Sequence, residues 1–247
     1  MAWRGARGCA MIDVKKGRAS MTRVWRVFSL TLAALLLAMM PGIAGSSQPC
    51  APFRDGKVDP AKLDSMLDAA DDGRLYRIET DNSEFGFSVT SSLQEVRGKF
   101  LQVQGGMALD TLGIEQDQVL VAIRTDSLDT NCEYAEHMLR GVNFFDVKQY
   151  PEILFVSTGF NWVTQTRATL VGDLTLHGVT RPVTFDVQLT NVFGEQAVDT
   201  DTILVKATSS IRRSDFGMKA IPRLVEDEVR LGMHVQARKY YASSIAE

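Results

Sequence analysis

Apolar and polar residues alternate with a period of two through most of the chain after residue 75, most clearly over residues 169–190. A period of two places alternate side chains on opposite faces of a strand. The apolar face of this segment carries Leu170, Leu174, Leu176, Val183, Phe185, Val187 and Leu189. Gly178 suits a turn that needs positive φ, and Pro182 suits the first position of the second strand. The segment therefore predicts an antiparallel hairpin with one buried face.

The same period recurs in a series of short segments with few helical patterns between them. These segments are residues 76–80, 85–89, 96–109, 119–123, 153–155, 160–162, 203–207 and 229–235. In residues 96–109 we place Leu101, Val103, Met107 and Leu109 on one face, with a bulge or sharp bend at Gly105-Gly106. Eight or nine strands in succession predict an all-β antiparallel barrel or sandwich.

Two segments have helical spacing instead. In residues 59–72, Asp59 is a candidate N-cap and Pro60 occupies the first turn, so we expect a short amphipathic helix over a barrel end or an edge strand. In residues 132–146, Tyr134, Met138 and Leu139 recur at helical spacing before Gly141, and Phe144 and Phe145 follow as an apolar plug. We expect this segment to lie across one mouth of the barrel, as a short helix in a long barrel connection often does.

The N-terminal 44 residues have the pattern of a leader and signal peptide. Arg23 and Arg26 precede an apolar run over residues 27–40, and the small residues Gly42 and Ala44 follow. A membrane anchor needs about 20 apolar residues, and this run is shorter. Met21 is an alternative start for this signal. We therefore predict a secreted, periplasmic protein without a stable membrane anchor, with a linker and short helix over residues 45–74 and a barrel over residues 75–240.

Removal of residues 1–44 changes the charge and the cysteine count. The whole chain has a net charge of −3, and the segment contains seven basic residues and one acidic residue, so the remainder has a net charge of −9. An acidic surface argues against nucleic acid as a partner. Cys50 and Cys132 remain, and an oxidising compartment permits a disulfide between them. The sequence leaves open whether they form this bridge or are two unrelated thiols.

The sequence contains no recognisable catalytic or metal-binding motif. His137, His177 and His234 are not spaced with other ligands as in metal sites, and a local hydrogen bond is the expected role of His177, which lies in the hairpin connection. Phosphate-loop and nucleophile-elbow patterns are also absent from the sequence. We therefore predict no catalytic residues, no metal and no cofactor, and we favour a binding protein over an enzyme.

Four segments resemble the YceI-like family of polyisoprenoid-binding periplasmic proteins. They are YRIETDNSEFGFSVTSSLQEVRGKF at residues 76–100, HMLRGVNFFDVKQYP at 137–151, GDLTLHGVTRP at 172–182 and SDFGM at 214–218. The resemblance implies an extended, eight-stranded, antiparallel lipocalin-like barrel with one or two short helices and an apolar tunnel for an isoprenoid chain. Where the family often has histidines in its first two strands, this chain has Asn82 and Ser91.

These observations predict a protein that holds an isoprenoid lipid, a quinone tail or another long apolar molecule inside its barrel. The candidate ligand-binding residues are Phe85, Phe87, Val89, Leu101, Val103, Phe144, Phe155, Leu174, Phe185, Val187 and Met218. Two alternatives remain: an enzyme or isomerase that uses the barrel as a reaction cavity, and a stress-response structural protein whose barrel is filled. The sequence also leaves the oligomeric state open between a monomer and a homodimer.

Overall fold

A computed structural model describes residues 58–92, 94–109, 117–190 and 201–241. The predicted signal peptide, the position of Cys50 and most of the predicted linker lie outside these residues. Secretion and the Cys50–Cys132 bridge therefore stay predictions. In the described part of the chain, no helix combines the length and the apolar composition required to cross a membrane.

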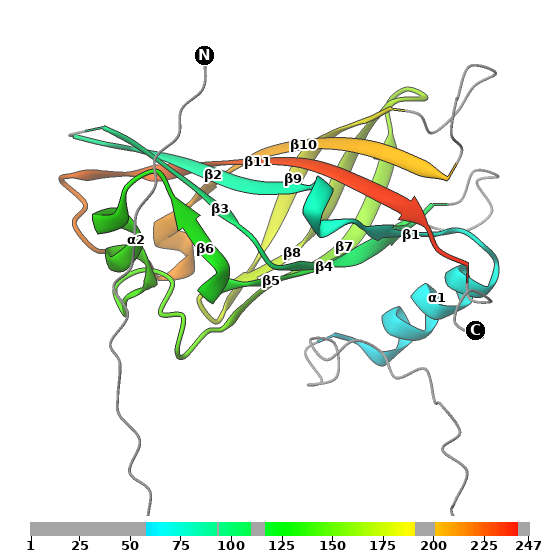
Figure 1. Ribbon diagram of the computed structural model, residues 1–247, viewed down its shortest axis with the longest axis horizontal. Helices are drawn as coiled ribbons and strands as arrows, with labels where there is room; N and C mark the ends of the chain where they lie inside the picture. The colour runs from blue at the N-terminus through cyan, green and yellow to red at the C-terminus, as the bar shows by residue number, and fades with distance from the viewer. Residues whose placement is uncertain (1–57, 93, 110–116, 191–200, 242–247) are drawn as a thin grey trace, which may run out of the picture. The chain divides into compact units, whose positions relative to one another are not determined.

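The alternating segments form one antiparallel sheet that closes on itself (Figure 1). Eight strands pair in a ring in the order β1-β4-β5-β7-β8-β9-β10-β11, and β11 pairs again with β1. Their bounds are β1 Leu75–Ile78, β4 Val103–Ala108, β5 Gln118–Arg124, β7 Glu152–Trp162, β8 Arg167–Leu176, β9 Val179–Thr190, β10 Thr202–Arg212 and β11 Val225–Lys239. Ring closure pairs the backbone groups that an open sheet would leave at its edges. The predicted eight-stranded barrel is therefore confirmed.

Three further strands lengthen the barrel at one end: β2 (Glu84–Ser91), β3 (Glu95–Phe100) and β6 (Leu128–Thr130). They continue β1, β4 and β5 after short interruptions, two of which are the 3₁₀ turns η2 (Thr80–Asn82) and η3 (Thr125–Ser127). The pairings of β2 with β3 and β11, and of β3 with β6, repeat those of the strands they continue. Three long, bent strands are thus each divided in two.

The interruption between β3 and β4 changes the alternation that the sequence predicts. Two residues, Leu101 and Gln102, separate the strands, so Phe100 and Val103 both face inward and are 8% and 3% exposed. Leu101 turns outward and is 55% exposed. The placement of Leu101 on the inner face was therefore wrong, because a two-residue break reverses the phase of the alternation. Of the bulge or sharp bend expected at Gly105-Gly106, the bulge is wrong, since β4 pairs with β5 in continuous register, although Gly105 has a positive φ of 147°.

A bulge does occur in β7. Ser157 pairs with Gly172 and Gly159 pairs with Val171, so Thr158 is an extra residue opposite β8. Because of this extra residue, the inward positions change from odd-numbered residues such as Phe155 to even-numbered residues such as Phe160. Residues 153–155 and 160–162 are consequently one strand, although their patterns are out of phase in the sequence.

The hairpin of β8 and β9 has a two-residue turn. Leu176 pairs with Val179, and the turn residues His177 and Gly178 have φ angles of 51° and 72°. Two positive φ angles are typical of the type I′ turn, which matches the twist of the strands. A Cβ atom on Gly178 would lie 2.5 Å from the ring of Tyr150, so the position requires glycine on both grounds.

Pro182 lies within β9, not at its start as predicted. It pairs with Asp173 of β8, whereas the pairing of β9 with β10 covers residues 186–190. Pro182 is therefore outside the part of β9 that is paired on both sides, where a missing N–H would cost a ladder hydrogen bond.

Two α-helices pack on the barrel: α1 (Pro60–Asp71) and α2 (Glu133–Arg140). The side chain of Asp59 accepts a hydrogen bond of 3.0 Å from the N–H of Ala61, which confirms the predicted N-cap. Met66 and Ala69 of α1 pack on outward-facing residues of β4, β5 and β7, among them Leu120. The helix thus packs on the outer wall of the barrel, whereas the sequence predicts a position over a barrel end or an edge strand.

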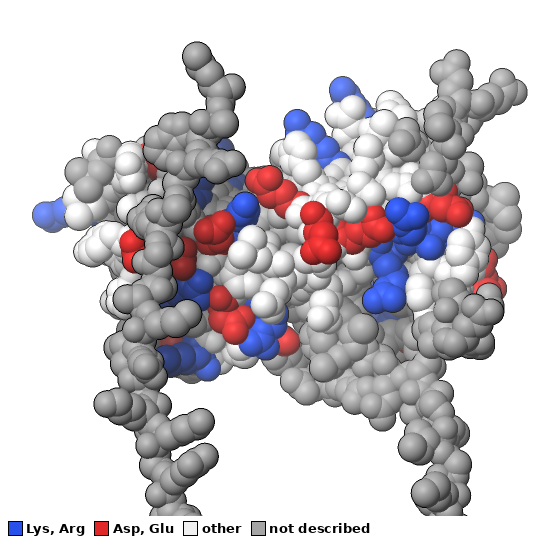
Figure 2. All heavy atoms as spheres, viewed as in Figure 1, with Lys and Arg blue, Asp and Glu red and all other residues white. Residues whose placement is uncertain are grey.

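The outer surface of the barrel is polar because the alternation places charged residues there. Acidic and basic side chains lie interspersed on the face shown in Figure 2. Arg97 pairs with Glu95 at 2.6 Å, and Lys99 pairs with Asp129 at 3.7 Å. Such exposed pairs contribute roughly 0–1 kcal/mol each, so the stability of the fold comes mainly from the inner face.

Candidate functional site

The inner faces of the strands enclose a cavity of about 180 Å³. At roughly 10–15 Å³ for each water-sized group, it has room for about a dozen such groups. Its wall contains 32 residues, contributed by strands around the barrel and by the segments near α2 and after β10. A cavity with a continuous wall of this kind is the principal candidate for a functional site.

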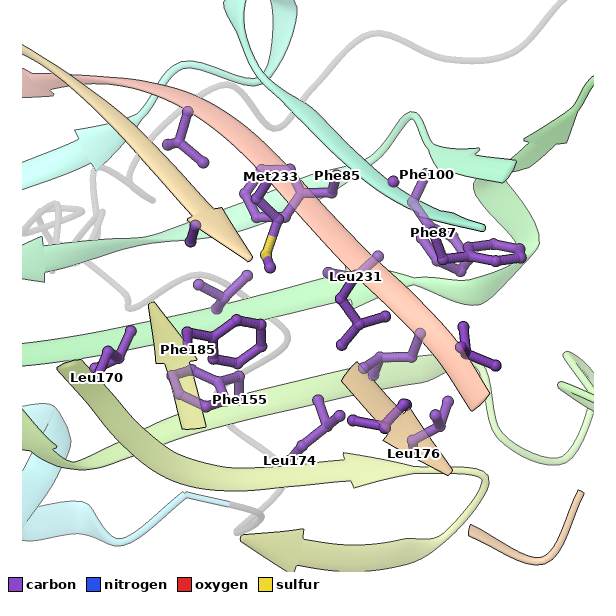
Figure 3. Close-up of a pocket in the computed structure, with 18 of the residues that line it drawn as sticks. Phe85, Phe87, Phe100, Phe155, Leu170, Leu174, Leu176, Phe185, Leu231 and Met233 are labelled. Atoms are coloured by element: carbon purple, nitrogen blue, oxygen red, sulfur yellow. The ribbon is translucent and has the colours of Figure 1, made fainter. Parts of the chain in front are cut away.

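Side chains from several strands converge inside the cavity, as Figure 3 shows for Phe155, Phe185, Leu231 and Met233. Phe155 of β7 and Phe185 of β9 meet edge to face, with ring centroids 5.3 Å apart. Phe155 pairs with Leu174 of β8, and its ring lies over Gly172 of the same strand, where a Cβ atom would lie 2.4 Å from the ring. A glycine on the inner face thus sets the position of an aromatic wall residue.

A second aromatic group lies toward the α2 end of the cavity. Phe87, Phe100 and Phe145 form a triangle with centroid distances of 5.6–5.9 Å. Phe145 comes from the segment after α2, and it lines the cavity together with Leu139 and Phe144. The helix and its following segment therefore contribute one end of the wall, as the predicted plug implies. Tyr134 was placed wrongly on the packed face, since it is 78% exposed.

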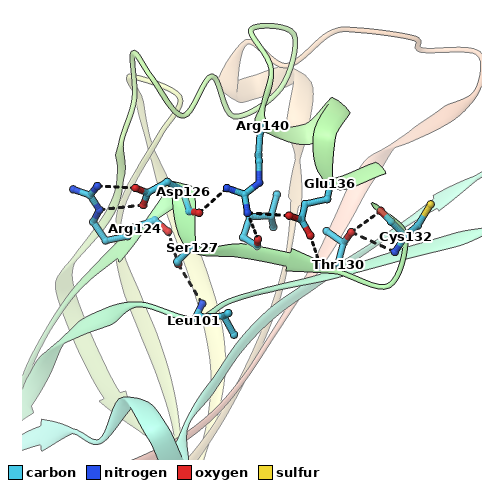
Figure 4. A network of polar contacts seen from close by, with 9 residues as sticks. Leu101, Arg124, Asp126, Ser127, Thr130, Cys132, Glu136 and Arg140 are labelled. Atoms are coloured by element: carbon cyan, nitrogen blue, oxygen red, sulfur yellow. Dashed lines mark hydrogen bonds and ion pairs between the residues drawn. The ribbon is translucent and has the colours of Figure 1, made fainter. Parts of the chain in front are cut away.

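Arg140 fixes α2 to the barrel (Figure 4). Its guanidinium donates to the carbonyl oxygens of Asp126 at 2.7 Å and Leu128 at 2.6 Å, and to Glu136 at 2.9 Å. The carboxylate of Asp126 pairs in turn with Arg124 at 2.9 Å. A hydrogen bond from Arg124 holds the pKa of Asp126 below its usual value. The network connects the helix over the cavity to the β5–β6 junction.

The wall also includes Arg213 of η4 (Arg213–Phe216) and Met218, which follows η4. Phe216 is 2% exposed, and its carbonyl oxygen lies 3.1 Å from Nδ1 of His177. The ring of Tyr150 packs against that of His177, with the two ring centroids 4.6 Å apart. His177 therefore makes a hydrogen bond, but not the local one that the sequence predicts, because its partner is 39 residues away in the sequence.

Nine of the eleven candidate ligand-binding residues line the cavity: Phe85, Phe87, Val89, Phe144, Phe155, Leu174, Phe185, Val187 and Met218. Val103 is buried in the core beside the wall, and Leu101 lies outside on the surface. Binding by the nine residues stays a prediction, because the structure establishes only their position.

Other residues of the wall were not predicted from the sequence. Leu231 and Met233 of β11 belong to the alternating segment at residues 229–235 that the sequence predicts, but they were not among the candidate ligand-binding residues. Phe100 was hidden by the phase change at Leu101. Arg213 carried no signal, because a cation in a sequence is normally assigned to the surface.

The cavity offers a wall for an apolar molecule and few groups for catalysis. Arg213 is the one charged residue among its 32 lining residues, and no histidine, hydroxyl or carboxylate side chain lines it. Within the described ranges, no group of three or more His, Cys, Asp or Glu residues could hold a metal ion.

A closed antiparallel barrel around an apolar interior defines a lipocalin-like class of protein. Residues 76–237 match the YceI-like domain, so the chain belongs to the YceI-like family.

Curated relatives agree with this assignment. A UPF0312 protein of Pseudomonas putida strain W619 is 33% identical over 144 residues, which cover 58% of this chain and 74% of that protein. A UPF0312 protein of Pseudomonas fluorescens strain SBW25 is 30% identical over 148 residues, with 60% of this chain and 73% of that protein covered.

Solved structures share the fold. BcnA of Burkholderia cenocepacia superposes with a TM-score of 0.58 at 21% identity and covers 64% of this chain and 98% of its own. A polyisoprenoid binding domain of Saccharophagus degradans, implicated in plant cell wall breakdown, has a TM-score of 0.50 at 15% identity. The match covers 66% of this chain and 98% of that domain. At these identities the likeness concerns the fold.

Proposed function

We propose that the protein is a periplasmic carrier that holds an apolar, isoprenoid-type chain inside its barrel. The observation that carries the proposal is the cavity of about 180 Å³ whose lining residues, Arg213 apart, are apolar or glycine. A related fold is described as a polyisoprenoid binding domain, which agrees with this proposal. The N-terminal signal pattern supports a periplasmic location.

The size of the cavity sets the expected energetics. About a dozen buried CH₂-sized groups contribute on the order of 10 kcal/mol at about 0.8 kcal/mol each. Association opposes this with a cost of roughly 4–15 kcal/mol. Because an isoprene unit has five carbons, about a dozen groups correspond to two or three isoprene units. A longer chain gains affinity only by widening the barrel or extending beyond it.

Lipid that co-purifies with the protein tests the proposal. The full chain is expressed with its leader, collected from the periplasm and examined by native mass spectrometry before and after organic extraction. We expect an adduct that extraction removes and that chromatography identifies as a prenyl lipid or quinone, on a chain that begins near residue 45. An extracted protein that takes up neither farnesol, with three isoprene units, nor geranylgeraniol, with four, contradicts the binding function, and retention in the cytoplasm contradicts the location.

A further inference from the structure

One face of α1 contacts the outside of the wall whose inner side lines the cavity. The residues of this face recur at the helical spacing of i, i+3, i+4 and i+7: Lys62, Ser65, Met66 and Ala69. The hydroxyl of Ser65 accepts a hydrogen bond of 2.6 Å from Nε2 of Gln118 in β5. On the other side, β5 and β7 line the cavity through Val119, Val121, Phe155 and Phe160. A single layer of sheet therefore separates α1 from the cavity.

Lys62 binds the barrel at the bulge of β7. Its Nζ donates a hydrogen bond of 2.7 Å to the carbonyl oxygen of Ser157, a residue that is 2% exposed. The hydroxyl of Ser157 accepts in turn from the N–H of Val119 in β5 at 2.8 Å. The paired residues of β5 and β7 end at Leu120 and Val156. The two side chains therefore continue the connection where the main-chain pairing stops.

The bulge is the part of this wall that resists widening least. A bulge leaves its extra residue unpaired and interrupts the ladder, here at Thr158. Elsewhere in the wall, widening breaks consecutive main-chain hydrogen bonds. The bulge lies between Phe155 and Phe160, which both line the cavity. A group that holds the bulge in place therefore also fixes the space between these two rings.

The barrel does not need α1 to close. The eight strands form their ring without the helix, and the match to the YceI-like domain begins at residue 76, after α1 ends at Asp71. The contact between the helix and the bulge is thus an addition to the domain and not part of its closure.

We propose that Lys62 is a positioning residue that limits the length of the isoprenoid chain that the barrel accepts. The proposal rests on the lipid-binding function and concerns the selectivity of the same cavity. Lys62 acts through Ser157: its ammonium group holds the bulge against outward movement, so the cavity keeps room for about two or three isoprene units. A hydrogen bond from a charged donor is about twice as strong as a neutral one, which suits a single side chain to this role.

Four prenyl alcohols that differ only in length test the limit: geraniol, farnesol, geranylgeraniol and geranylfarnesol, with two to five isoprene units. Each is titrated by calorimetry into the delipidated full chain. In the wild type we expect the affinity to rise as far as farnesol and then to level off. Lys62→Met keeps an apolar stem and removes the donor, so geraniol and farnesol should bind as in the wild type. Geranylfarnesol should bind to this variant about fivefold more tightly or better, since each buried CH₂ changes an affinity several-fold.

The outcomes separate this proposal from the carrier function. Equal length profiles in Lys62→Met and the wild type overturn the Lys62 proposal and leave the carrier function intact, as does a wild-type affinity that keeps rising to geranylfarnesol. A uniform loss of affinity at every length also overturns the proposal, because it reports only weaker packing of α1. Binding of none of the alcohols by the wild type overturns both.

Two further variants assign the limit to the hydrogen bond. Lys206→Met is the matched control, because Lys206 is an exposed lysine on the outer face of β10, and it should keep the wild-type profile. Lys62→Arg keeps a charged donor and should retain the limit. A gain for geranylfarnesol in either variant that equals the gain in Lys62→Met overturns the proposal.

The wild type supplies a test that does not depend on the folding of a variant. Bound geranylfarnesol should make the amide of Val119 exchange faster with solvent than bound farnesol does. The longer chain widens the wall at the bulge and disturbs the hydrogen bond from Val119 to Ser157. Equal exchange rates with the two ligands overturn the proposal.

Discussion

Individual residues decide how much space the barrel leaves for a ligand. Gly172 admits the ring of Phe155, and Val187 of β9 is 5% exposed on the inner face that carries Phe185. Interiors are packed closely enough that one larger side chain changes the free volume. The capacity of the cavity is thus set by the sizes of a few inward residues.

Val187→Phe should fill part of the cavity and abolish uptake of geranylgeraniol. Overpacking costs about 1–3 kcal/mol of stability, so the protein should remain folded. Uptake is measured by calorimetry, and folding by circular dichroism. Gln188→Ala is the control, because Gln188 is the next residue on the same strand and faces outward. A folded Val187→Phe protein with unchanged uptake would show that the ligand does not occupy this part of the barrel.

At the scale of elements, the interruptions of the strands and the helix between β6 and β7 define the α2 end of the cavity. Arg140 holds α2 through two carbonyl oxygens and Glu136, and α2 in turn places Leu139, Phe144 and Phe145 on the wall. The position of this wall therefore depends on a polar network outside the cavity.

Arg140→Met should loosen α2 while keeping an apolar stem of similar length. The loss of hydrogen bonds from a charged donor is expected to lower the free energy of unfolding by roughly 1–3 kcal/mol. Amide hydrogen exchange over residues 133–147 should become faster, and bound lipid should dissociate faster.

Arg97→Met is the comparison variant, since Arg97 forms an exposed pair with Glu95 and its loss should change stability by less than about 0.5 kcal/mol. Exchange at α2 that is identical in Arg140→Met and the wild type would mean that packing alone holds the helix.

At the scale of the molecule, the closed ring makes binding and folding one equilibrium. Residues far apart in the sequence, such as Phe85 of β2 and Met233 of β11, form adjacent parts of one wall. Unfolding therefore destroys the cavity completely. A ligand that binds only the folded barrel stabilises it by mass action.

A prenyl ligand at 100 times its dissociation constant should add about 2.7 kcal/mol to the free energy of unfolding. For a domain of this size, that corresponds to a rise in Tm of roughly 5–10 °C. Differential scanning calorimetry of the delipidated protein, with and without geranylgeraniol, measures the rise. Tm should not change with a short, polar control such as glycerol. A Tm that is independent of ligand concentration would indicate a filled barrel and favour the structural-protein alternative.

Local patterns in the sequence are enough to predict most of the strands, the two helices and most of the inward residues. Period-two alternation is a local property that follows from the geometry of a strand, so Phe185 and Val187 could be placed without any knowledge of their neighbours. The N-cap at Asp59 and the glycine turn at Gly178 are equally local, since each depends on the backbone within a few residues.

The positions where the alternation changes phase, and the distant groups that meet, follow from pairing and packing in the folded chain. The break at Leu101 and the bulge after Ser157 depend on pairing with neighbouring strands, which the local pattern does not contain. The burial of Arg213 depends on carbonyl oxygens of residues 218–226, which reach it only when the chain turns back into β11. A cation is expected at the surface unless the fold supplies hydrogen-bond acceptors for it. The charge inside this apolar cavity therefore follows only from the folded chain.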